Sequence, residues 1–315
     1  MYKTYAFGVD LGGTTIKMGF FETNGQLIDM WEIPTRKEEN GKFILEDISN
    51  AINKKLEQKG ISKDDVEGVG LGVPGPVGED GTVFRCVNLG WGVFNVEKSL
   101  SELTNLKVKA GNDANVAALG EMWQGGGAGY KNIVMITLGT GVGGGVIQNG
   151  HIVAGANGAA GEIGHICVND DDTTTVCGCG NTGCLEIYSS ATGIVRSTKR
   201  YLEQNLDVKT CLRDFDSLEA KDIFDSAKNG DKVALEQVEL VGKYLGKGLT
   251  YVACTVNPEA FVIGGGMARA GEILMESIRR NFKQKVMYAC RETEFKQAKL
   301  GNNAGIYGGV FMLLD

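Results

Sequence analysis

The sequence predicts an α/β protein with two domains, and three observations lead to that prediction. Apolar, strand-like segments alternate with helix-like segments along the chain. A strand, a glycine turn and a second strand open the chain in FGVDLGGTTIKMGFF, and the same pattern returns about 130 residues later in NIVMITLGTGVGGGVIQNG. The 315 residues exceed what one hydrophobic core usually serves. We therefore expect a distant internal duplication built into two domains.

The first part of the chain begins with a predicted hairpin. Residues 4–10 are apolar and β-prone, LGGTT turns, IKMGFF resumes the strand pattern, and GQLIDMWEIP indicates a third strand. Apolar residues at helical spacing predict a helix from Phe43 that stops at Gly60. VEGVGLGVPGP indicates a short buried strand that runs into a Gly/Pro loop. LKVKAGNDANVAALGEMW indicates a strand, a turn at GND and a helix.

The second part repeats the strand pattern and then becomes helical. Residues 155–190 form a glycine- and cysteine-rich insertion, and residues 190–255 have a helical pattern. AFVIGGG indicates another buried strand with a glycine turn, and a helix follows from about residue 270. The last segment, AGIYGGVFMLLD, indicates a helix of small and apolar residues.

Composition and charge exclude several classes of protein. The net charge is −7 and no basic stripe is visible, which argues against nucleic-acid binding. No signal-peptide pattern opens the chain and no run of about 18 apolar residues occurs, so we expect a cytoplasmic protein without a membrane partner. The eight cysteines are then expected to be reduced, and a tight cysteine cluster indicates metal binding before disulfides.

Three glycine turns are candidate nucleotide sites. Glycines after a strand let backbone N–H groups approach a phosphate, as in DLGGTTIK, LGTGVGGG and GGGMA. Asp10, at a strand end, could hold Mg²⁺ through water, and the third turn could accept a base or ribose. Two matched turns in two domains would clamp a nucleotide triphosphate; the alternatives are plain hairpin turns and close helix–strand packing. The candidate residues are Asp10, Gly12, Gly13, Thr14, Lys17, Gly139, Thr140, Gly141, Gly264, Gly265 and Gly266.

Asp113 is the candidate general base. The segment GNDANVAALGE places Asp113 at or near the start of a helix, where a carboxylate is also an ordinary helix cap. The functional alternative is phosphoryl transfer, which needs positioning, charge neutralisation and a carboxylate that accepts the hydroxyl proton. Asn112, beside it, could hydrogen-bond a neighbouring hydroxyl.

The segment GEIGHICVNDDDTTTVCGCGNTGCLE predicts a structural zinc site. One imidazole and three thiolates make a closed tetrahedral shell, and the candidate ligands are His165, Cys177, Cys179 and Cys184. Buried, reduced cysteines without metal are the alternative, and Cys167 is the nearest spare thiol. Clamping this loop would fix two flanking carboxylates, Glu162 and Glu186, which suit a polyhydroxylated ligand.

At this point the motifs resemble a known family. DLGGTTIK, GVPGP, NDANVAALGE, LGTGVGGG, GANGAAGEIGH and CGCGNTGCLE occur in the order typical of the ROK family of bacterial sugar kinases, and they look most like those of its ATP-dependent glucokinases. The resemblance covers essentially the whole chain. It implies an actin-like (ribonuclease H-like) fold of two α/β domains around a central cleft, usually in a homodimer.

The resemblance also implies domain boundaries and residue roles. The expected N-terminal domain comprises residues 1–115 and about 300–315, and the C-terminal domain comprises residues 116–299 with the zinc loop at 165–184. Asp113 is the expected base for the sugar 6-hydroxyl, with ATP and Mg²⁺ as cofactors and glucose as the sugar. The expected sugar contacts are Asn88, Asn112, Asp113, Glu162, His165 and Glu186.

Two alternatives remain open. Family members also phosphorylate N-acetylglucosamine, N-acetylmannosamine, fructose and allose, and these members share most of the motifs. A non-catalytic sugar sensor is a more distant alternative, which Asp113 and the two phosphate turns disfavour. Some ROK members are repressors with an N-terminal helix-turn-helix; here DLGGT begins at Asp10, which argues against one.

Overall fold

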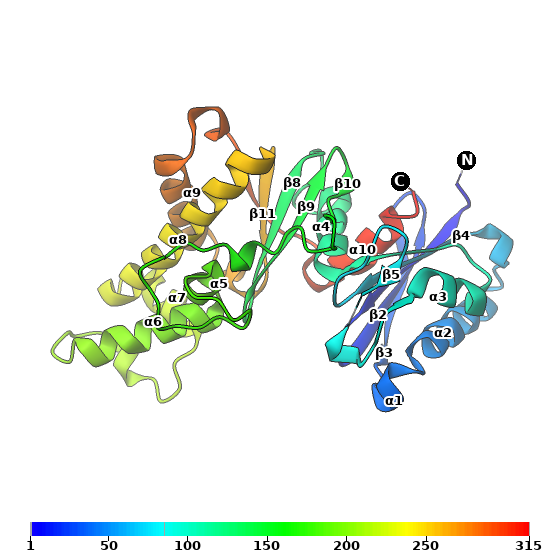
Figure 1. Ribbon diagram of the computed structural model, residues 1–315, viewed down its shortest axis with the longest axis horizontal. Coiled ribbons are helices and arrows are strands. Elements are labelled where there is room, and N and C mark those ends of the chain that lie inside the picture. Colours follow the sequence, from blue (N-terminus) through cyan, green and yellow to red (C-terminus); the bar gives the residue numbers. More distant parts are fainter. Residues whose placement is uncertain (1, 85, 315) are drawn as a thin grey trace. The chain divides into compact units, whose positions relative to one another are not determined.

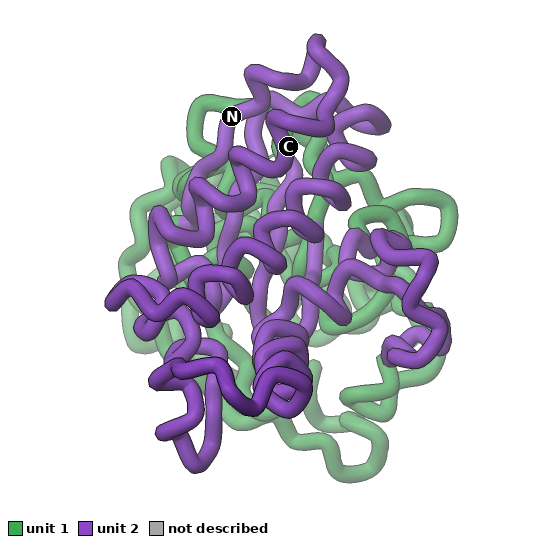
Figure 2. Tube along the Cα trace, turned by 90° about the vertical axis from the view of Figure 1, so that its left-hand side faces the viewer, with its two compact units in different colours: residues 1–133, 145–161, 299–315 green, residues 134–144, 162–298 purple. Residues whose placement is uncertain are grey.

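The computed structural model describes residues 2–84 and 86–314, and the chain divides into two compact units. Unit 1 comprises residues 1–133, 145–161 and 299–315, and unit 2 comprises residues 134–144 and 162–298 (Figure 2). The helices and strands follow one another as an α/β chain (Figure 1), which confirms the predicted class.

Unit 1 is built on a sheet with the strand order β3-β2-β1-β4-β7. The predicted hairpin is confirmed, because β1 (Tyr5–Leu11) and β2 (Thr15–Glu22) pair antiparallel, and β3 (Leu27–Pro34) continues the meander. β4 (Val66–Val73) pairs parallel with β1, and β7 (Val108–Asn112) pairs parallel with β4. Parallel strands end at the same edge of a sheet, so β1, β4 and β7 bring their last residues together.

Helices cover both faces of this sheet. Alternate residues of a strand point to opposite faces. Phe7 and Val9 share one core with α2 (Ile44–Lys59) and α3 (Val96–Thr104), whereas Ala6 packs with α10 (Ala304–Phe311). The short elements of unit 1 are α1 (Glu38–Gly41), β5 (Thr82–Val83), β6 (Phe94–Asn95) and β10 (His151–Ile152).

The C-terminal helix α10 explains the small residues at the end of the chain. A Cβ atom at Gly8 would lie 1.9 Å from the carbonyl oxygen of Ile306, and one at Gly70 would lie 1.7 Å from that of Gly309. Glycines on both partners therefore let the helix backbone lie directly on the strands. The predicted small-residue helix is confirmed, and it belongs to the unit that contains the N-terminus.

The second sheet repeats the arrangement of the first. Its order is β10-β9-β8-β11-β12, with β8 (Ile133–Leu138), β9 (Val142–Gln148), β11 (Ala260–Gly264) and β12 (Glu294–Gln297). Each order reads third, second, first, fourth and fifth strand of its set. The duplicated strand–turn–strand pattern of the sequence is therefore a duplicated sheet.

The helices of unit 2 follow the insertion. They are α5 (Leu185–Ser189), α6 (Ala191–Gln204), α7 (Ala220–Lys228), α8 (Lys232–Val256) and α9 (Glu272–Lys285). Glycines again allow close packing, because a Cβ atom at Gly242 of α8 would lie 1.9 Å from Oγ of Ser277 in α9. No helix in the described part of the chain has the length and apolar character that crossing a bilayer requires.

One domain boundary and one turn differ from the sequence-based expectation. Unit 1 does not stop at residue 115 but continues to 133, because α4 (Asp113–Gln124) packs on α10; a Cβ atom at Gly120 would lie 2.1 Å from the carbonyl oxygen of Ala304. The turn predicted at GND is also wrong, since β7 ends at Asn112 and α4 begins at the next residue.

Candidate functional site

Two carboxylates of unit 1 meet at the carboxyl ends of its parallel strands. Asp10 pairs with Gly72 across β1 and β4, Gly72 pairs with Gly111 across β4 and β7, and Asp113 follows directly after β7. A Cβ atom at Gly72 would lie 3.6 Å from Cα of Asp113 and 3.7 Å from Oδ1 of Asp10. The fold thus places both acidic residues on either side of one glycine.

The electrostatics of this pair favour a bound cation. Burial and, after it, the nearby charge of Asp113 raise the pKa of Asp10 to about 6, and the Lys17 ammonium opposes both effects. A buried carboxyl beside a second acidic group is costly to ionise without compensation. Carboxylate oxygens are the ligands that Mg²⁺ prefers, so these residues fit the predicted magnesium site.

Asn112 caps the N-terminus of α4, and Asp113 is the first residue of this helix. Asn112 is the N-cap of α4, and its Oδ1 accepts from the N–H groups of Ala114 and Asn115 at 3.1 and 3.2 Å. Its Nδ2 donates to the Gly75 carbonyl and to Oδ1 of Asp113, both at 3.1 Å. The capping alternative therefore applies to Asn112 in full, and its side chain orients Asp113. Its contact with a sugar stays a prediction.

Asn88 lies on an exposed loop of the same unit. The backbones of Cys86 and Trp91 pair and close this loop, and Asn88 occupies its tip in a short 3-10 turn, Val87–Leu89. The Trp91 indole donates to the Gly41 carbonyl at 3.2 Å and anchors the loop on the neighbouring turn. Burial and, to a smaller extent, the charge of Asp113 raise the pKa of the Cys86 thiol at the base of this loop.

A lysine side chain that no sequence motif indicates lies beside the first glycine turn. Gly12 N–H donates to the Thr15 carbonyl at 3.0 Å. This hydrogen bond closes the turn between β1 and β2, with Gly13 and Thr14 at its tip. A Cβ atom at Gly13 would lie 3.5 Å from Nζ of Lys37. Lys37, just beyond β3, therefore brings its ammonium to the turn where a phosphate is predicted.

The Lys17 ammonium contacts the segment before α10. Its Nζ donates to the Asn302 carbonyl and to Oδ1 of Asn303 at 3.1 and 3.2 Å, and it lies 3.6 Å from Glu32. In this structure Lys17 ties β2 to the segment before α10. Its predicted contact with the nucleotide stays a prediction.

The second and third glycine turns line one pocket of unit 2. The pocket has a volume of about 440 Å³ and is bordered by Gly139, Thr140 and Gly266, with Phe224 and Met267 as apolar walls. This volume lies in the range of small-ligand sites. The structure therefore brings together two of the three turns that the sequence singles out.

The three positions of the third turn have different structural reasons for being glycine. Gly265 has a φ of 84°, and a Cβ atom there would lie 2.4 Å from the Leu138 carbonyl oxygen. A Cβ atom at Gly264 would lie 3.1 Å from Cβ of Ala298. These two positions follow the close-packing alternative, whereas Gly266 has open space and borders the pocket.

Glu186 connects the second turn to the cysteine loop. Its Oε2 accepts from Val142 N–H at 3.1 Å, and a Cβ atom at Gly141 would clash with that oxygen at 2.2 Å. Its Oε1 accepts from the Cys177 thiol at 3.3 Å. A single carboxylate thus touches both the glycine turn and the cluster.

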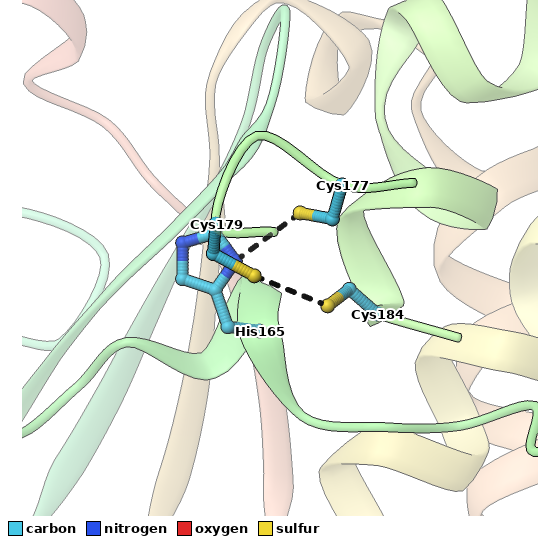
Figure 3. A group of neighbouring side chains, drawn as sticks. All are labelled: His165, Cys177, Cys179 and Cys184. Carbon is cyan, nitrogen blue, oxygen red and sulfur yellow. Dashed lines mark hydrogen bonds between the residues drawn. The ribbon is translucent and has the colours of Figure 1, made fainter. Parts of the chain in front are cut away.

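The four predicted zinc ligands come together in unit 2 (Figure 3). One ring nitrogen of His165 and the three sulfur atoms of Cys177, Cys179 and Cys184 all lie within 4.8 Å of one another. Cys177 Sγ is 3.5 Å from His165 Nδ1, and Cys179 Sγ is 3.6 Å from Cys184 Sγ. Zinc–sulfur bonds of about 2.3 Å in a tetrahedron put ligands about 3.8 Å apart, so the cluster fits zinc.

The spare thiol belongs to a different environment. Cys167 is exposed, and its thiol donates to Oδ1 of Asp170 at 2.9 Å. It is not among the residues whose ligand atoms gather in the cluster. The structure therefore favours Cys177, Cys179 and Cys184 as the sulfur ligands.

Burial makes two of the three thiols difficult to ionise unless a cation is bound. Burial, followed by hydrogen bonds that the Cys184 thiol donates to the neighbouring cysteines, raises the pKa of Cys184 to about 12. Burial also raises the pKa of Cys177, whereas a backbone hydrogen bond from Asn181 lowers that of Cys179. Buried thiolates next to one another need a bound cation, and a coordinating thiol is deprotonated by it.

His165 is oriented so that both ring nitrogens have a use. Nδ1 faces the cysteines, and Nε2 lies 3.7 Å from Oε2 of Glu162. The side chains of His165 and Glu162 are 35% and 64% exposed, so both reach solvent and are open to a ligand. A histidine that binds metal through one nitrogen can donate from the other.

Two residues at these sites carried no sequence signal. Lys37 follows a strand in a polar stretch, and Phe224 lies in α7 without any motif. Only the three-dimensional packing brings them to the glycine turns.

Comparisons with known proteins agree with the motifs. The family model described as "ROK family" matches residues 6–315. A glucokinase from Halalkalibacterium halodurans is 45% identical over 99% of this chain and 96% of its own length. An N-acetyl-D-glucosamine kinase from Yersinia enterocolitica is 32% identical over 98% of this chain and 99% of its own length.

A solved structure gives the same result for the fold. The crystal structure of a ROK family glucokinase from Streptomyces griseus, in complex with glucose and AMPPNP, matches with a TM-score of 0.72 and 32% identity, and 98% of each chain is covered. The predicted actin-like fold is thereby confirmed. The matches extend over nearly the whole of this sequence, and the chain belongs to the ROK family.

Proposed function

We propose that this protein is an ATP-dependent hexose kinase that transfers the γ-phosphoryl group of ATP to the 6-hydroxyl of D-glucose. The observation that carries the proposal is the pair Asp10 and Asp113, held at neighbouring strand ends on either side of Gly72. The 45% identity to a glucokinase and the likeness to a glucokinase bound to glucose and AMPPNP support it. The products are ADP and glucose 6-phosphate.

Asp113 is the general base in this proposal. Its carboxylate accepts the proton of the sugar 6-hydroxyl as the oxygen bonds to the γ-phosphorus and the bond from phosphorus to the bridging oxygen of ADP breaks. Asn112 positions this carboxylate through the 3.1 Å hydrogen bond to its Oδ1. The start of α4 adds the partial positive charge of a helix N-terminus, which favours the ionised carboxylate.

Asp10 has a separate duty. Its partly buried carboxyl, beside Asp113 and opposite Lys17, suits a divalent cation held directly or through water. Bound Mg²⁺ supplies charge neutralisation for the phosphates of ATP. Lys37 adds a second positive charge at the turn that contains Gly12, Gly13 and Thr14.

The pocket of unit 2 is the proposed site for the adenosine part of ATP. Gly139, Thr140 and Gly266 offer open backbone, and Phe224 and Met267 offer apolar surface for a flat base. Gly141 continues the same turn toward the phosphates. Glycine at these positions allows backbone N–H groups to approach the ligand closely.

The zinc loop is the proposed sugar clamp. His165, Cys177, Cys179 and Cys184 would hold a structural zinc ion, which supplies a rigid closed tetrahedral anchor. That anchor fixes the His165 ring, so that its second nitrogen can donate to a sugar hydroxyl. Glu162 and Glu186 would accept from sugar hydroxyls, and Asn88 and Asn112 are the proposed contacts from unit 1.

Another hexose is the second candidate substrate. The 32% identity to an N-acetyl-D-glucosamine kinase over nearly the full chain keeps N-acetylglucosamine in consideration, with N-acetylmannosamine and fructose as further alternatives. The 45% identity to a glucokinase favours glucose. A homodimer is also proposed, on the family resemblance, and light scattering coupled to gel filtration measures it.

Substitution of Asp113 tests the proposed chemistry. Asp113→Asn keeps an oxygen for the 2.8 Å hydrogen bond from Ala114 N–H but removes the base. A general base contributes about 10²- to 10⁴-fold, so kcat should fall by that factor while calorimetry still detects glucose binding. The matched control is Asp65→Asn, an exposed carboxylate in another part of unit 1, which should keep full activity. Near-normal turnover in Asp113→Asn would overturn the assignment.

A further inference from the structure

A second pocket of unit 2 lies apart from the glycine turns. It has a volume of about 520 Å³ and is bordered by the loop Asn169–Thr175 and by residues of α5, α6 and α8. None of its lining residues borders the pocket of Gly139 and Gly266, so the two pockets are separate. Its size suits a small organic ligand.

Two arginines stand on one side of this pocket. Arg196 and Arg200 are four residues apart on α6, a spacing that puts both on one helix face. Arg196 donates to the Ile187 carbonyl, which leaves most of its five N–H donors available. Arg200 is exposed and makes no ion pair with any described residue. Such paired guanidinium groups match the geometry of a phosphate.

The inner wall offers further donors. Gln237 is only 5% exposed, and its Oε1 accepts from Ser197 at 2.5 Å, while its Nε2 makes no hydrogen bond with the described residues. The described buried side-chain atoms that lack a partner are Asn115 Oδ1 and Ser189 Oγ, so the Gln237 nitrogen is accessible and can donate to a ligand or water in the pocket. Tyr244 borders the same pocket, and its hydroxyl oxygen accepts from Asn169 at 3.4 Å. The hydroxyl hydrogen of Tyr244 can therefore turn toward the pocket.

Two acidic residues, Asp171 and Asp172, also border the pocket, and the protein itself holds the second of them. Asp172 accepts from the Tyr188 hydroxyl at 2.8 Å, from the Thr174 hydroxyl at 2.8 Å and from two backbone N–H groups. These donors hold the pKa of Asp172 below its usual range, with the Tyr188 hydrogen bond as the largest cause. Because the oxygens of Asp172 are occupied by the protein, Asp171, which is exposed on the loop, is the remaining acidic group in the pocket wall beside Arg196 and Arg200.

The aromatic pair adds a surface for a sugar ring. Tyr188 and Tyr244 are stacked with their ring centroids 4.3 Å apart, and both line the pocket. Aromatic faces offer the apolar area that the C–H groups of a sugar can cover. Charged donors for an anion, neutral donors for hydroxyls and an aromatic surface therefore occur together.

We propose that this pocket binds a phosphorylated sugar, with the phosphate on Arg196 and Arg200 and the hydroxyl groups on Gln237 and Tyr244. The site stands independently of the proposed function, because its residues do not include any assigned to the transfer of phosphate. It is placed to influence the sugar clamp. Tyr188 is two residues beyond Glu186, and the loop Asn169–Thr175 lies between His165 and Cys177 in the chain.

Calorimetry with fructose 6-phosphate tests this site. The titrations use wild type, Arg200→Ala and the matched control Lys199→Ala, which removes an exposed neighbouring cation that does not line the pocket. Loss of a charged hydrogen-bonding partner should weaken binding about tenfold or more in Arg200→Ala and leave Lys199→Ala unchanged.

The ligand class is tested with the same three proteins. Inorganic phosphate should compete with fructose 6-phosphate but bind more weakly, and unphosphorylated fructose should show no dependence on Arg200. Equal affinity of all three proteins for fructose 6-phosphate, or no detectable binding to wild type, would overturn the proposal. Tight binding of phosphate alone, equal to that of the ester, would also overturn the assignment to a sugar. Fructose 6-phosphate binding is measured without ATP, so kinase activity has no part in the result.

Discussion

The carboxylate pair of unit 1 and the Cys/His cluster of unit 2 are positioned in different ways. Asp10 and Asp113 sit at the ends of hydrogen-bonded strands, and glycine-mediated packing of α10 supports those strands from behind. His165 and the cysteines sit on turns and loops with little regular structure around them. The first site is therefore held by the backbone, whereas we propose that the second depends on a bound zinc ion for its order.

The largest effect is expected from a substitution that disturbs the packing of α10 on the strands of unit 1. Gly70→Ala would place Cβ 1.7 Å from the Gly309 carbonyl oxygen, so the strand or α10 must move. We expect the free energy of unfolding to fall by about 3 kcal/mol or more, which thermal and denaturant unfolding measure. Gly92→Ala is the matched control, since its Cβ meets nothing within 4 Å. Equal melting temperatures for the two variants would contradict the packing account.

The second prediction concerns the Cys/His cluster, which a substitution can disturb without changing Asp10 or Asp113. Cys179→Ser removes an exposed ligand of the cluster, so zinc measured by mass spectrometry should fall from about one ion per chain to nearly none. Disturbing the support of a metal site typically costs about ten- to a hundredfold, and we expect glucose affinity to weaken by that factor.

The control for this experiment is the neighbouring thiol. Cys167→Ser changes an exposed cysteine that lies outside the cluster, and both zinc content and glucose affinity should stay at the wild-type level. Metal-free wild-type protein with full glucose affinity would refute the idea that zinc holds the sugar clamp.

The smallest effect sharpens the account of unit 1. Lys37→Ala removes the ammonium near Gly13, and we expect about a tenfold rise in the KM for ATP with little change in glucose binding. Lys54→Ala, an exposed lysine of α2, serves as the control and should leave the KM for ATP unchanged. An unchanged KM in Lys37→Ala would remove this residue from the phosphate site.

Much of the fold could be predicted because local patterns specified it. The hairpin, the helix that ends at Gly60 with a φ of 65°, and the duplicated strand–turn–strand pattern all follow from glycine placement and apolar spacing. The boundary after residue 115 could not be predicted, since it depends on Gly120 of α4 packing against α10 at the far end of the sequence.

The candidate sites divide in the same way. Four cysteine and histidine positions close together in sequence indicate their own cluster. Lys37 near Gly13, and Phe224 with Met267 beside Gly139, depend on segments that meet only in the folded chain. The capping role of Asn112 was assigned to Asp113 as an alternative, because either side chain can accept from the first turn of a helix.

The most direct test of the central claim is ADP release by the wild-type protein with Mg-ATP and a panel of hexoses. We expect sugar-dependent ADP release with the highest kcat/KM for glucose, and glucose 6-phosphate as the product. A preference for N-acetylglucosamine, N-acetylmannosamine or fructose would change the substrate and keep the roles of Asp10 and Asp113. ADP release that no hexose raises above the sugar-free rate would contradict the claim that this protein is a hexose kinase.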